Sequence, residues 1–338
     1  MEGTRKATSS IPVRALRDEK IPAIGFGTFS ARLSSEVVAD AVHTALREGY
    51  RFLDCAAAYG NEAQIGEVLK QAIGEGIPRE ELFVLSKLRN EQHGMVEQAC
   101  ENSMRDLCLA QLDAYLIHWP VPNALSPRAS EGVYDPDSRP YRHSEFMKTW
   151  RSMEKLVLDG KVRHIGVSNV TIAKLKLLLR DAQIKPSICE MEIHPNFQQG
   201  ELFQFCLDHD ILPVAYSPMG APRRPERNCR PTDFVDMEDP AVVHVARAHG
   251  VHPGVVCIKW AFQRGQIPIP FSSNPDNIRA NLQAVLADPL TDEEMDMIRA
   301  SDRNCRLSRG DAYLWKGARS YLELWDVNEA EALQKLDV

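Results

Sequence analysis

The feature that most constrains the fold of this chain is an alternation of short apolar runs with segments of helical periodicity. Eight runs rich in apolar and β-branched residues are predicted to be strands: 24–28, 51–55, 82–87, 113–118, 162–168, 187–193, 211–217 and 266–270. Near-continuous apolar runs are typical of parallel strands that are covered on both faces. Eight such strands alternating with helices predict an α/β protein, either a closed barrel or an open doubly wound sheet.

The segments between these runs carry helix signals. In 35–49 the apolar residues recur with helical spacing, Ser34 or Ser35 offers an N-cap, and Gly49 offers a C-terminal stop. A second helix is predicted over 144–159, closed by Gly160. Thr291 and Glu294 have the spacing of a capping box, which predicts a helix start there.

Three long segments have little regular pattern. The connections 120–142 and 218–239 are rich in proline, and the tail 303–338 contains several aromatic residues. Long irregular loops in a compact domain are usually functional or disordered. Because no linker divides the sequence, we expect a single domain over residues 1–338, with the tail covering the substrate pocket.

Composition narrows the classes of partner. The net charge is −7, and no Lys/Arg-dense stretch interleaved with aromatics occurs, so we expect no nucleic-acid partner. A local cluster of Arg223, Arg224, Arg227 and Arg230 can meet nucleotide phosphates or can equally be a solvated loop. No apolar run is long enough for a membrane span, so no membrane is expected.

The cysteines and the N-terminus point to a cytoplasmic location. No two of the eight cysteines are closer than eight residues, so neither redox nor zinc-ribbon spacing is present, and reduced thiols are expected. The sequence MEGTRKATSS lacks the apolar core of a signal peptide. No cluster of metal ligands is apparent.

Four polar residues stand at the ends of three of these apolar runs or just beyond. Asp54 ends the second run, Lys87 the third and His118 the fourth, and Tyr59 lies just beyond the second. In a parallel barrel those ends meet on one face, where barrel enzymes place their active sites. Each residue alone can cap a strand or pair at the surface, but all four together favour a site and the (β/α)₈ barrel.

The open-sheet alternative lacks its usual fingerprint. Gly25-Phe26-Gly27 resembles the start of a dinucleotide-binding motif, but Ser30 stands at the third glycine position. No helix begins at once, and no acidic residue follows about 20 positions later. A Rossmann-type dehydrogenase is therefore disfavoured.

The four polar residue types suit carbonyl reduction. A carbonyl that accepts hydride at carbon develops negative charge on oxygen and needs a proton donor. Tyr59 can give that proton, and a cation such as Lys87 nearby lowers the pKa of its phenol. Asp54 can hold the ammonium of Lys87, and His118 can orient the substrate oxygen.

The sequence resembles the aldo-keto reductase superfamily, particularly its aldose reductase-like branch. The resemblance spans about residues 12–300 and rests on IGFGTF, GYRFLDCAAAYGNE, REELFVLSKL, LDAYLIHWP, MEKLVLDGKVRHIGVSN, EIHP and AYSPMG. It implies a (β/α)₈ barrel, a parallel-stranded TIM barrel with long loops at its C-terminal face, where a nicotinamide cofactor binds extended. It implies Tyr59 as acid/base, with Lys87, Asp54 and His118 as partners.

The resemblance also implies cofactor positions. Ser168 and Asn169 match residues that bind the nicotinamide carboxamide, and Tyr216 matches the tyrosine under the nicotinamide ring. The other matches are Ser217 and Met219 along the pyrophosphate, Gly27 and Thr28 near the ribose, Ser272 within the nucleotide-binding segment IPFS, and Asn281 at the adenine.

Three departures from the family pattern concern the cofactor. Glu190 replaces a glutamine at the carboxamide, and an ionised carboxylate accepts hydrogen bonds but cannot donate them. Phe271 replaces the lysine of I-P-K-S, and Asn277 replaces a downstream arginine. Charge-assisted contacts to a 2′-phosphate are the strong ones. We therefore expect NAD(H) to be favoured over NADP(H), unless the loop arginines supply the missing charge.

A fourth departure concerns the substrate. Arg89 replaces a tryptophan usual after K-L in aldose reductases, whereas Phe29 and Trp119 are kept. An arginine in the pocket wall suits sugars, polyols or oxo acids, because its fork donates several hydrogen bonds. Alternatively, Arg89 swings out and pairs with an acidic loop residue.

The sequence thus predicts an NAD(P)-dependent oxidoreductase interconverting an aldehyde or ketone and its alcohol, with a role in carbohydrate metabolism. The alternative is a non-catalytic nicotinamide-binding regulatory subunit of the same fold. His194 and Glu192, in the family segment EIHP, are interpreted as structural residues.

Overall fold

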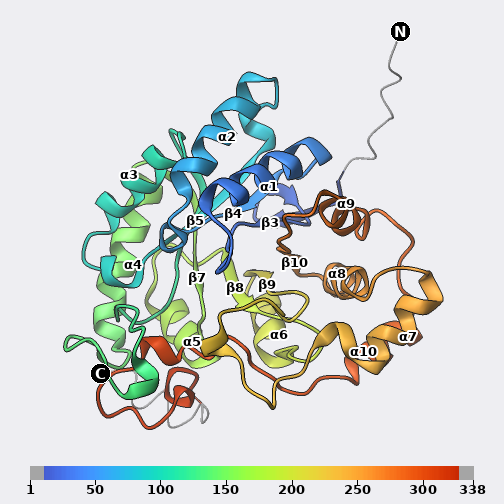
Figure 1. The fold of residues 1–338 in the computed structure, drawn as a ribbon. Coiled ribbons are helices and arrows are strands. Elements are labelled where there is room, and N and C mark those ends of the chain that lie inside the picture. The colour runs from blue at the N-terminus through green and yellow to red at the C-terminus, as the bar shows by residue number, and fades with distance from the viewer. Residues whose placement is uncertain (1–10, 327–338) are drawn as a thin grey trace.

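The computed structural model describes residues 11–326. Its centre is a parallel sheet whose strands pair in the order of the sequence (Figure 1). The strands are β3 (Phe26–Gly27), β4 (Phe52–Asp54), β5 (Phe83–Leu88), β6 (Leu112–Ile117), β7 (Val162–Ser168), β8 (Ile188–Glu192), β9 (Leu212–Tyr216) and β10 (Ile267–Pro268). Each of the eight predicted runs overlaps one of these strands, and β5 and β6 each extend one residue beyond their run.

Backbone hydrogen bonds close the sheet into a barrel. The amide of Gly25 donates to the carbonyl of Pro268 and that of Gly27 to Pro270, both at 3.0 Å, so the first and last strands are neighbours. The close approach depends on glycine, because a Cβ on Gly27 would lie 2.9 Å from the carbonyl oxygen of Ile269. The fold is a (β/α)₈ barrel, as predicted, and not an open sheet.

Helices cover the outside of the barrel (Figure 1). They are α1 (Ser35–Glu48), α2 (Glu62–Gly74), α3 (Val96–Asp106), α4 (His143–Leu158), α5 (Ile172–Asp181), α6 (Gly200–Asp208), α7 (Pro240–His249), α8 (Pro253–Arg264), α9 (Pro275–Gln283) and α10 (Asp292–Arg299). Ser34 caps α1 by accepting from the amide of Val37, and Gly49 ends it with φ 117°. The predicted capping box of Thr291 and Glu294 is present at α10.

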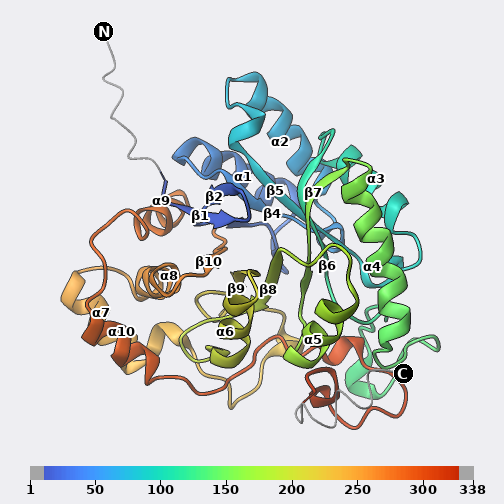
Figure 2. The ribbon, with the colours of Figure 1, turned by 180° about the vertical axis from the view of Figure 1, so that it is seen from behind.

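An antiparallel hairpin precedes the barrel and was not predicted from the sequence. It consists of β1 (Val13–Leu16) and β2 (Glu19–Pro22) and is visible from the side shown in Figure 2. Leu16 and Ile21 are buried in one apolar cluster with Phe52 and other inward-facing strand residues. The hairpin therefore seals the apolar interior of the barrel at the amino ends of its strands.

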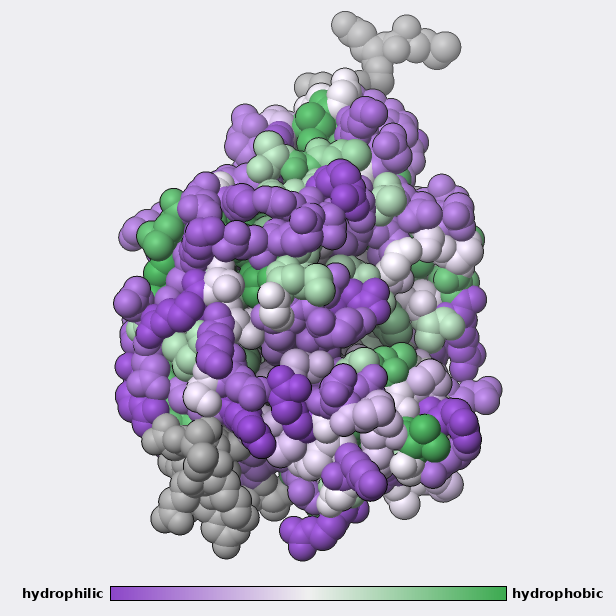
Figure 3. Space-filling view, turned by 90° about the vertical axis from the view of Figure 1, so that its left-hand side faces the viewer, coloured by the Kyte–Doolittle hydropathy of each residue, from purple (hydrophilic) through white to green (hydrophobic). Residues whose placement is uncertain are grey.

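Within residues 11–326 no helix is both long and apolar enough to cross a bilayer. The face shown in Figure 3 is covered mostly by hydrophilic side chains, and apolar residues are scattered among them. Scattered apolar residues are normal for a protein surface.

Candidate active site

The ammonium group of Lys87 is buried among polar groups that β4, β5 and β8 bring together. The ammonium of Lys87 forms an ion pair with Asp54 and donates to the carbonyl of Cys55 at 3.1 Å. It also donates to the hydroxyl of Tyr59 at 3.3 Å. Tyr59 ends a 3₁₀ turn, Ala57–Tyr59, that directly follows β4. The three predicted residues are therefore brought together.

His118 completes this group from the neighbouring strand. It follows β6, and its ring meets that of Tyr59 edge-on, with centroids 5.8 Å apart and planes at 81°. Burial, with the positive charges of Lys87 and Arg89, lowers the pKa of His118 to about 3. The imidazole is therefore neutral at physiological pH and has one N–H to offer.

The charge state of the cluster follows from burial and pairing. Burial disfavours the ammonium of Lys87, but the carboxyls of Asp54 and Glu190 outweigh it and raise the pKa of Lys87 well above its usual value. Burial raises the pKa of Tyr59, while Lys87 acts in the opposite direction. The expected net lowering of the phenol pKa is therefore not found, because desolvation of the phenolate exceeds the stabilisation by Lys87.

Glu190 lies closer to the reacting groups than the sequence indicated. Its Oε2 is 3.3 Å from the ammonium of Lys87, and both side chains are buried. Burial, reinforced by the charge of Asp54, raises the pKa of Glu190 well above the normal carboxyl value. A carboxyl that keeps its proton can donate as well as accept hydrogen bonds, whereas an ionised carboxylate can only accept them.

The ends of β7 and β9 bring the predicted carboxamide and ring-stacking residues into contact. The side-chain amide of Asn169 donates to the carbonyl of His118 at 2.9 Å and to the hydroxyl of Ser168 at 3.0 Å. The hydroxyl of Tyr216 donates to the amide oxygen of Asn169 at 2.7 Å. Ser217, the next residue, has a left-handed backbone with φ 52°.

The remaining predicted cofactor residues lie along the rim from β3 to α9. Thr28 is buried and donates to the carbonyl of Asp54 at 2.8 Å. Phe271 packs against Phe26 with ring centroids 5.7 Å apart. Asn277 is exposed and Asn281 is buried in α9; Ser272, just before that helix, and Met219, beyond β9, are partly buried.

These residues fit a nicotinamide cofactor in one specific respect. The Oε2 atom of Glu190 is buried and has no hydrogen-bond partner among the described residues. It lies in the middle of β8, next to β7, where Ser168 pairs with Glu190 in register. A carboxamide bound beside Ser168 and Asn169 would offer that oxygen a donor, which is the partner a buried polar atom needs.

The three predicted substrate residues differ in their exposure and in the side chains that they contact. Phe29 is 47% exposed, and its ring centroid lies 5.1 Å from that of Tyr59. Trp119 is buried and contacts Tyr313 and Trp325 of the tail, with centroids 4.8 and 5.7 Å away. Arg89 pairs with Glu91 at 2.6 Å, which is the alternative left open by the sequence.

A buried histidine joins the barrel to the loop 218–239 and to the tail. The Nδ1 of His194 lies 2.9 Å from Asp236 of the loop, and its Nε2 lies 3.2 Å from Glu192 at the end of β8. Glu192 also accepts from the amides of Leu307 and Ser308, at 2.8 and 2.9 Å. The structural interpretation of His194 and Glu192 is thus supported by these contacts.

A second carboxylate ties the loop directly to the tail. Asp233 forms ion pairs with Arg224 of the loop and with Arg309 of the tail. Arg230 lies 3.4 Å from Asp311 of the tail. We call the contacts of Asp233, Asp236 and Arg230 the loop–tail clasp. The carboxylates of the clasp were not predicted from the sequence, although acidic residues that follow the loop arginines were a visible signal.

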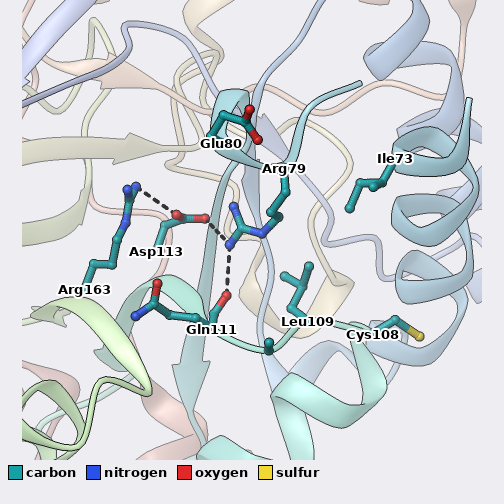
Figure 4. Close-up of a pocket in the computed structure, with 9 residues that line it drawn as sticks. Ile73, Arg79, Glu80, Cys108, Leu109, Gln111, Asp113 and Arg163 are labelled. Carbon is teal, nitrogen blue, oxygen red and sulfur yellow. Dashed lines mark hydrogen bonds and ion pairs between the residues drawn. The ribbon is translucent and has the colours of Figure 1, made fainter. Parts of the chain in front are cut away.

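One surface pocket lies away from these residues. It has a volume of about 390 Å³ and surrounds Arg79, Asp113 and Arg163 (Figure 4). Asp113 accepts from both arginines at 2.8 Å and from the amide of Val84 at 2.7 Å. Asp113 and Arg163 lie at the amino ends of β6 and β7, opposite to Lys87. The charged residues that line this pocket therefore pair with one another and join neighbouring strands.

Comparisons with known proteins agree with this arrangement. The family model described as the aldo/keto reductase family matches residues 23–303. The chain is 40% identical to an aldo/keto reductase of Synechocystis sp., covering 91% of this chain and 94% of the relative. It is 37% identical to the NADP-dependent D-sorbitol-6-phosphate dehydrogenase of Malus domestica, covering 86% and 93%.

A solved structure is also similar. The crystal structure of an aldo-keto reductase of Bombyx mori in complex with NADP matches with a TM-score of 0.77 and 31% identity. The match covers 88% of this chain and 95% of that one.

The ionic contacts of His194 give the protein a pH-dependent stability. Burial opposes its charge, but Asp236 and Glu192 outweigh burial and raise the pKa of His194 to about 9. Because the folded pKa exceeds the unfolded value near 6.5, the stabilisation is complete below that value and disappears as pH rises through about 9. We expect His194→Gln to lose up to about 3 kcal/mol at pH 6 and little at pH 10.

Urea unfolding of wild type and variant at several pH values measures this difference. His244→Gln, at an exposed position of α7, is the matched control and should follow the wild-type curve. An equal loss for His194→Gln at pH 6 and pH 10 would show that His194 is not charged in the folded protein.

Proposed function

The chain belongs to the aldo/keto reductase family, whose members are NAD(P)-dependent oxidoreductases of aldehydes and ketones, and from that premise we propose its reacting groups, cofactor preference and substrate class. The observation that carries the proposal is the contact of the Lys87 ammonium with both Asp54 and the hydroxyl of Tyr59. A phenol beside an anchored cation is a proton donor whose conjugate base has a charge partner.

Each of the four groups has one role in the proposed mechanism. The hydroxyl of Tyr59 gives its proton to the substrate oxygen during reduction and takes it back during oxidation. Lys87 stabilises the resulting phenolate, and Asp54 holds Lys87 in place. The neutral imidazole of His118 orients the carbonyl through its N–H. Asn169 and Tyr216 would hold a nicotinamide cofactor, which would supply or accept the hydride when bound.

Replacing Tyr59 tests the assignment. We expect Tyr59→Phe to reduce kcat about 10²–10⁴-fold or more, because the proton donor is lost, while cofactor still binds. Steady-state kinetics with an aldehyde substrate give kcat, and quenching of protein fluorescence gives cofactor affinity. Tyr50→Phe is the matched control, because Tyr50 is a buried phenol that donates instead to the carbonyl of Ile278.

Near wild-type turnover of Tyr59→Phe would exclude Tyr59 as the acid. Loss of cofactor binding together with turnover would point to a folding defect instead.

We propose that NAD(H) is favoured over NADP(H). Phe271 and Asn277 put a phenyl ring and a neutral amide where charge-assisted contacts to a 2′-phosphate would be needed. Two of the loop arginines that can replace those contacts are engaged elsewhere, Arg224 with Asp233 and Arg230 with Asp311. Arg223 is exposed, and the side chain of Arg227 lies outside the described part.

Restoring the two cations tests the preference. We expect wild type to have the higher kcat/KM with NADH, and Phe271→Lys with Asn277→Arg to raise kcat/KM for NADPH about 10–100-fold, because a hydrogen bond between charged groups contributes about 1.5–3 kcal/mol. Phe271→Leu is the control that alters packing without adding charge. A clear NADPH preference of the wild type would refute the proposal.

We propose a polar substrate, such as a sugar, a polyol or an oxo acid, handled in the cytoplasm as part of carbohydrate metabolism. Arg89 lies close enough to His118 for its charge to lower the pKa of that imidazole, so it borders the reacting groups while paired with Glu91. The tail, through Tyr313 and Trp325, packs on Trp119 and covers this side. All eight cysteines are free thiols, which supports a reducing compartment.

The pair of Arg89 and Glu91 offers a test of substrate class. We expect Arg89→Leu to lower kcat/KM for an anionic or polyhydroxylated aldehyde about tenfold and to leave a neutral apolar aldehyde nearly unchanged. Glu91→Gln is the matched control, because it frees Arg89 and should raise kcat/KM for the anionic aldehyde. Equal effects of Arg89→Leu on both aldehydes, or a preference of the wild type for large apolar aldehydes, would contradict the proposal.

A further inference from the structure

The ammonium of Lys87 has fewer hydrogens than oxygen neighbours. An ammonium group donates three hydrogen bonds. Four oxygens lie around it: those of Asp54, of the Cys55 carbonyl, of Tyr59 and of Glu190. Three of them accept a hydrogen bond, whereas Oε2 of Glu190 remains without a partner at 3.3 Å. Tyr59 and Glu190 thus compete for the third hydrogen.

The charges of the cluster are also unequal in number. Asp54 and Glu190 are two carboxyls beside one ammonium, and all three side chains are buried. A second ionised carboxylate there would be a buried charge without its own cation, which is costly. The cluster avoids that cost as long as the carboxyl of Glu190 is protonated.

We propose that Glu190 is a positioning residue that determines how well Lys87 can serve Tyr59. As a neutral acid, Glu190 leaves the third hydrogen of Lys87 to the phenol oxygen. As a carboxylate, it attracts that hydrogen and places a like charge near the phenolate. The inference rests on the proposed function, since it concerns the proton that Tyr59 gives and receives.

The protons of the reduction step balance as follows, and oxidation reverses each transfer. In reduction the O–H bond of Tyr59 breaks, a new O–H bond forms on the substrate oxygen, and the phenolate left behind needs the hydrogen of Lys87. The phenolate then regains its proton from water. Glu190 transfers no proton to the substrate. It acts only on the hydrogen bond and the charge that the phenolate meets.

The groups around Glu190 are consistent with this role. Asp54 and Lys87 face it from β4 and β5, Tyr59 from the turn after β4, and Tyr216 from β9. Burial, then the charge of Asp54, raises the pKa of Glu190, whereas Lys87 lowers it. The neighbouring thiol of Cys189 is buried, and its pKa is well above the usual value, so it adds no charge.

The pH profile of the variant Glu190→Gln tests the coupling. Glutamine keeps the shape of the side chain but never ionises. We expect the ionisation of Tyr59, seen at saturating cofactor as the alkaline limb of reduction and as the rising limb of oxidation, to move about one unit to lower pH. This shift means an about tenfold change in rate at a fixed pH on that limb. Glu190→Asp, which retains a carboxyl, should move the limb back toward its wild-type position.

Infrared difference spectra of the cofactor-free protein test the protonation independently of activity. We expect the wild type at neutral pH to show a protonated-carboxyl C=O band that is absent from Glu190→Gln and disappears from wild type as pH rises. Glu62→Gln is the matched control, because Glu62 is a second buried carboxyl with a raised pKa, hydrogen-bonded by Ser86 and Ser103. That variant should keep the band that Glu190→Gln loses.

The outcomes separate the inference from the proposed function. An active enzyme whose alkaline limb is the same in wild type and Glu190→Gln, or whose spectra lack the Glu190 band at neutral pH, overturns the inference alone. A wild type that reduces no carbonyl with NADH or NADPH overturns the proposed function, and the band then decides the state of Glu190. Fluorescence titration with cofactor separates any change in binding from the shift of the limb.

Discussion

The site depends on keeping one positive charge inside a protein barrel. The ammonium of Lys87 is fully buried, and its contact with Asp54 is what makes that burial tolerable. Its acceptors come from β4, from the turn that follows it and from β8, a strand further along the sheet. They meet only because the sheet closes between Gly27 and Pro270. The buried charge of Lys87 is therefore fully compensated only when the barrel is closed.

Local pattern was enough to predict strands that alternate with helices, because each strand is a short apolar run and several helices carry cap signals. The barrel was favoured over the open sheet by the positions of Asp54, Lys87 and His118 at strand ends. The bounds of β7 agree with the predicted 162–168, and the capping box at Thr291 is present. The hairpin β1–β2 was missed, since its strands have four residues each and bury little besides Leu16 and Ile21. Its existence depends on the barrel end that it seals, which no local pattern encodes.

The residues of the site were easier to predict than their charge states. That Asp54, Lys87 and Tyr59 gather follows from strand polarity, but the net pKa of Tyr59 results from opposed effects of burial and of Lys87. The sequence does not give their relative size. The distance between Glu190 and Lys87 depends on strands that are not neighbours in the sheet, and the pairing of Arg89 with Glu91 is a choice between rotamers.

The loop–tail clasp has a consequence for how this protein can diversify. The tail carries Tyr313 and Trp325 onto Trp119, while the loop borders the strand that ends in Tyr216. Because Asp233 holds both segments, neither can be exchanged for that of a relative without breaking buried ion pairs. Grafting a foreign tail to alter selectivity would need the matching loop as well. The two segments thus form a single structural unit, although more than sixty positions of the sequence separate them.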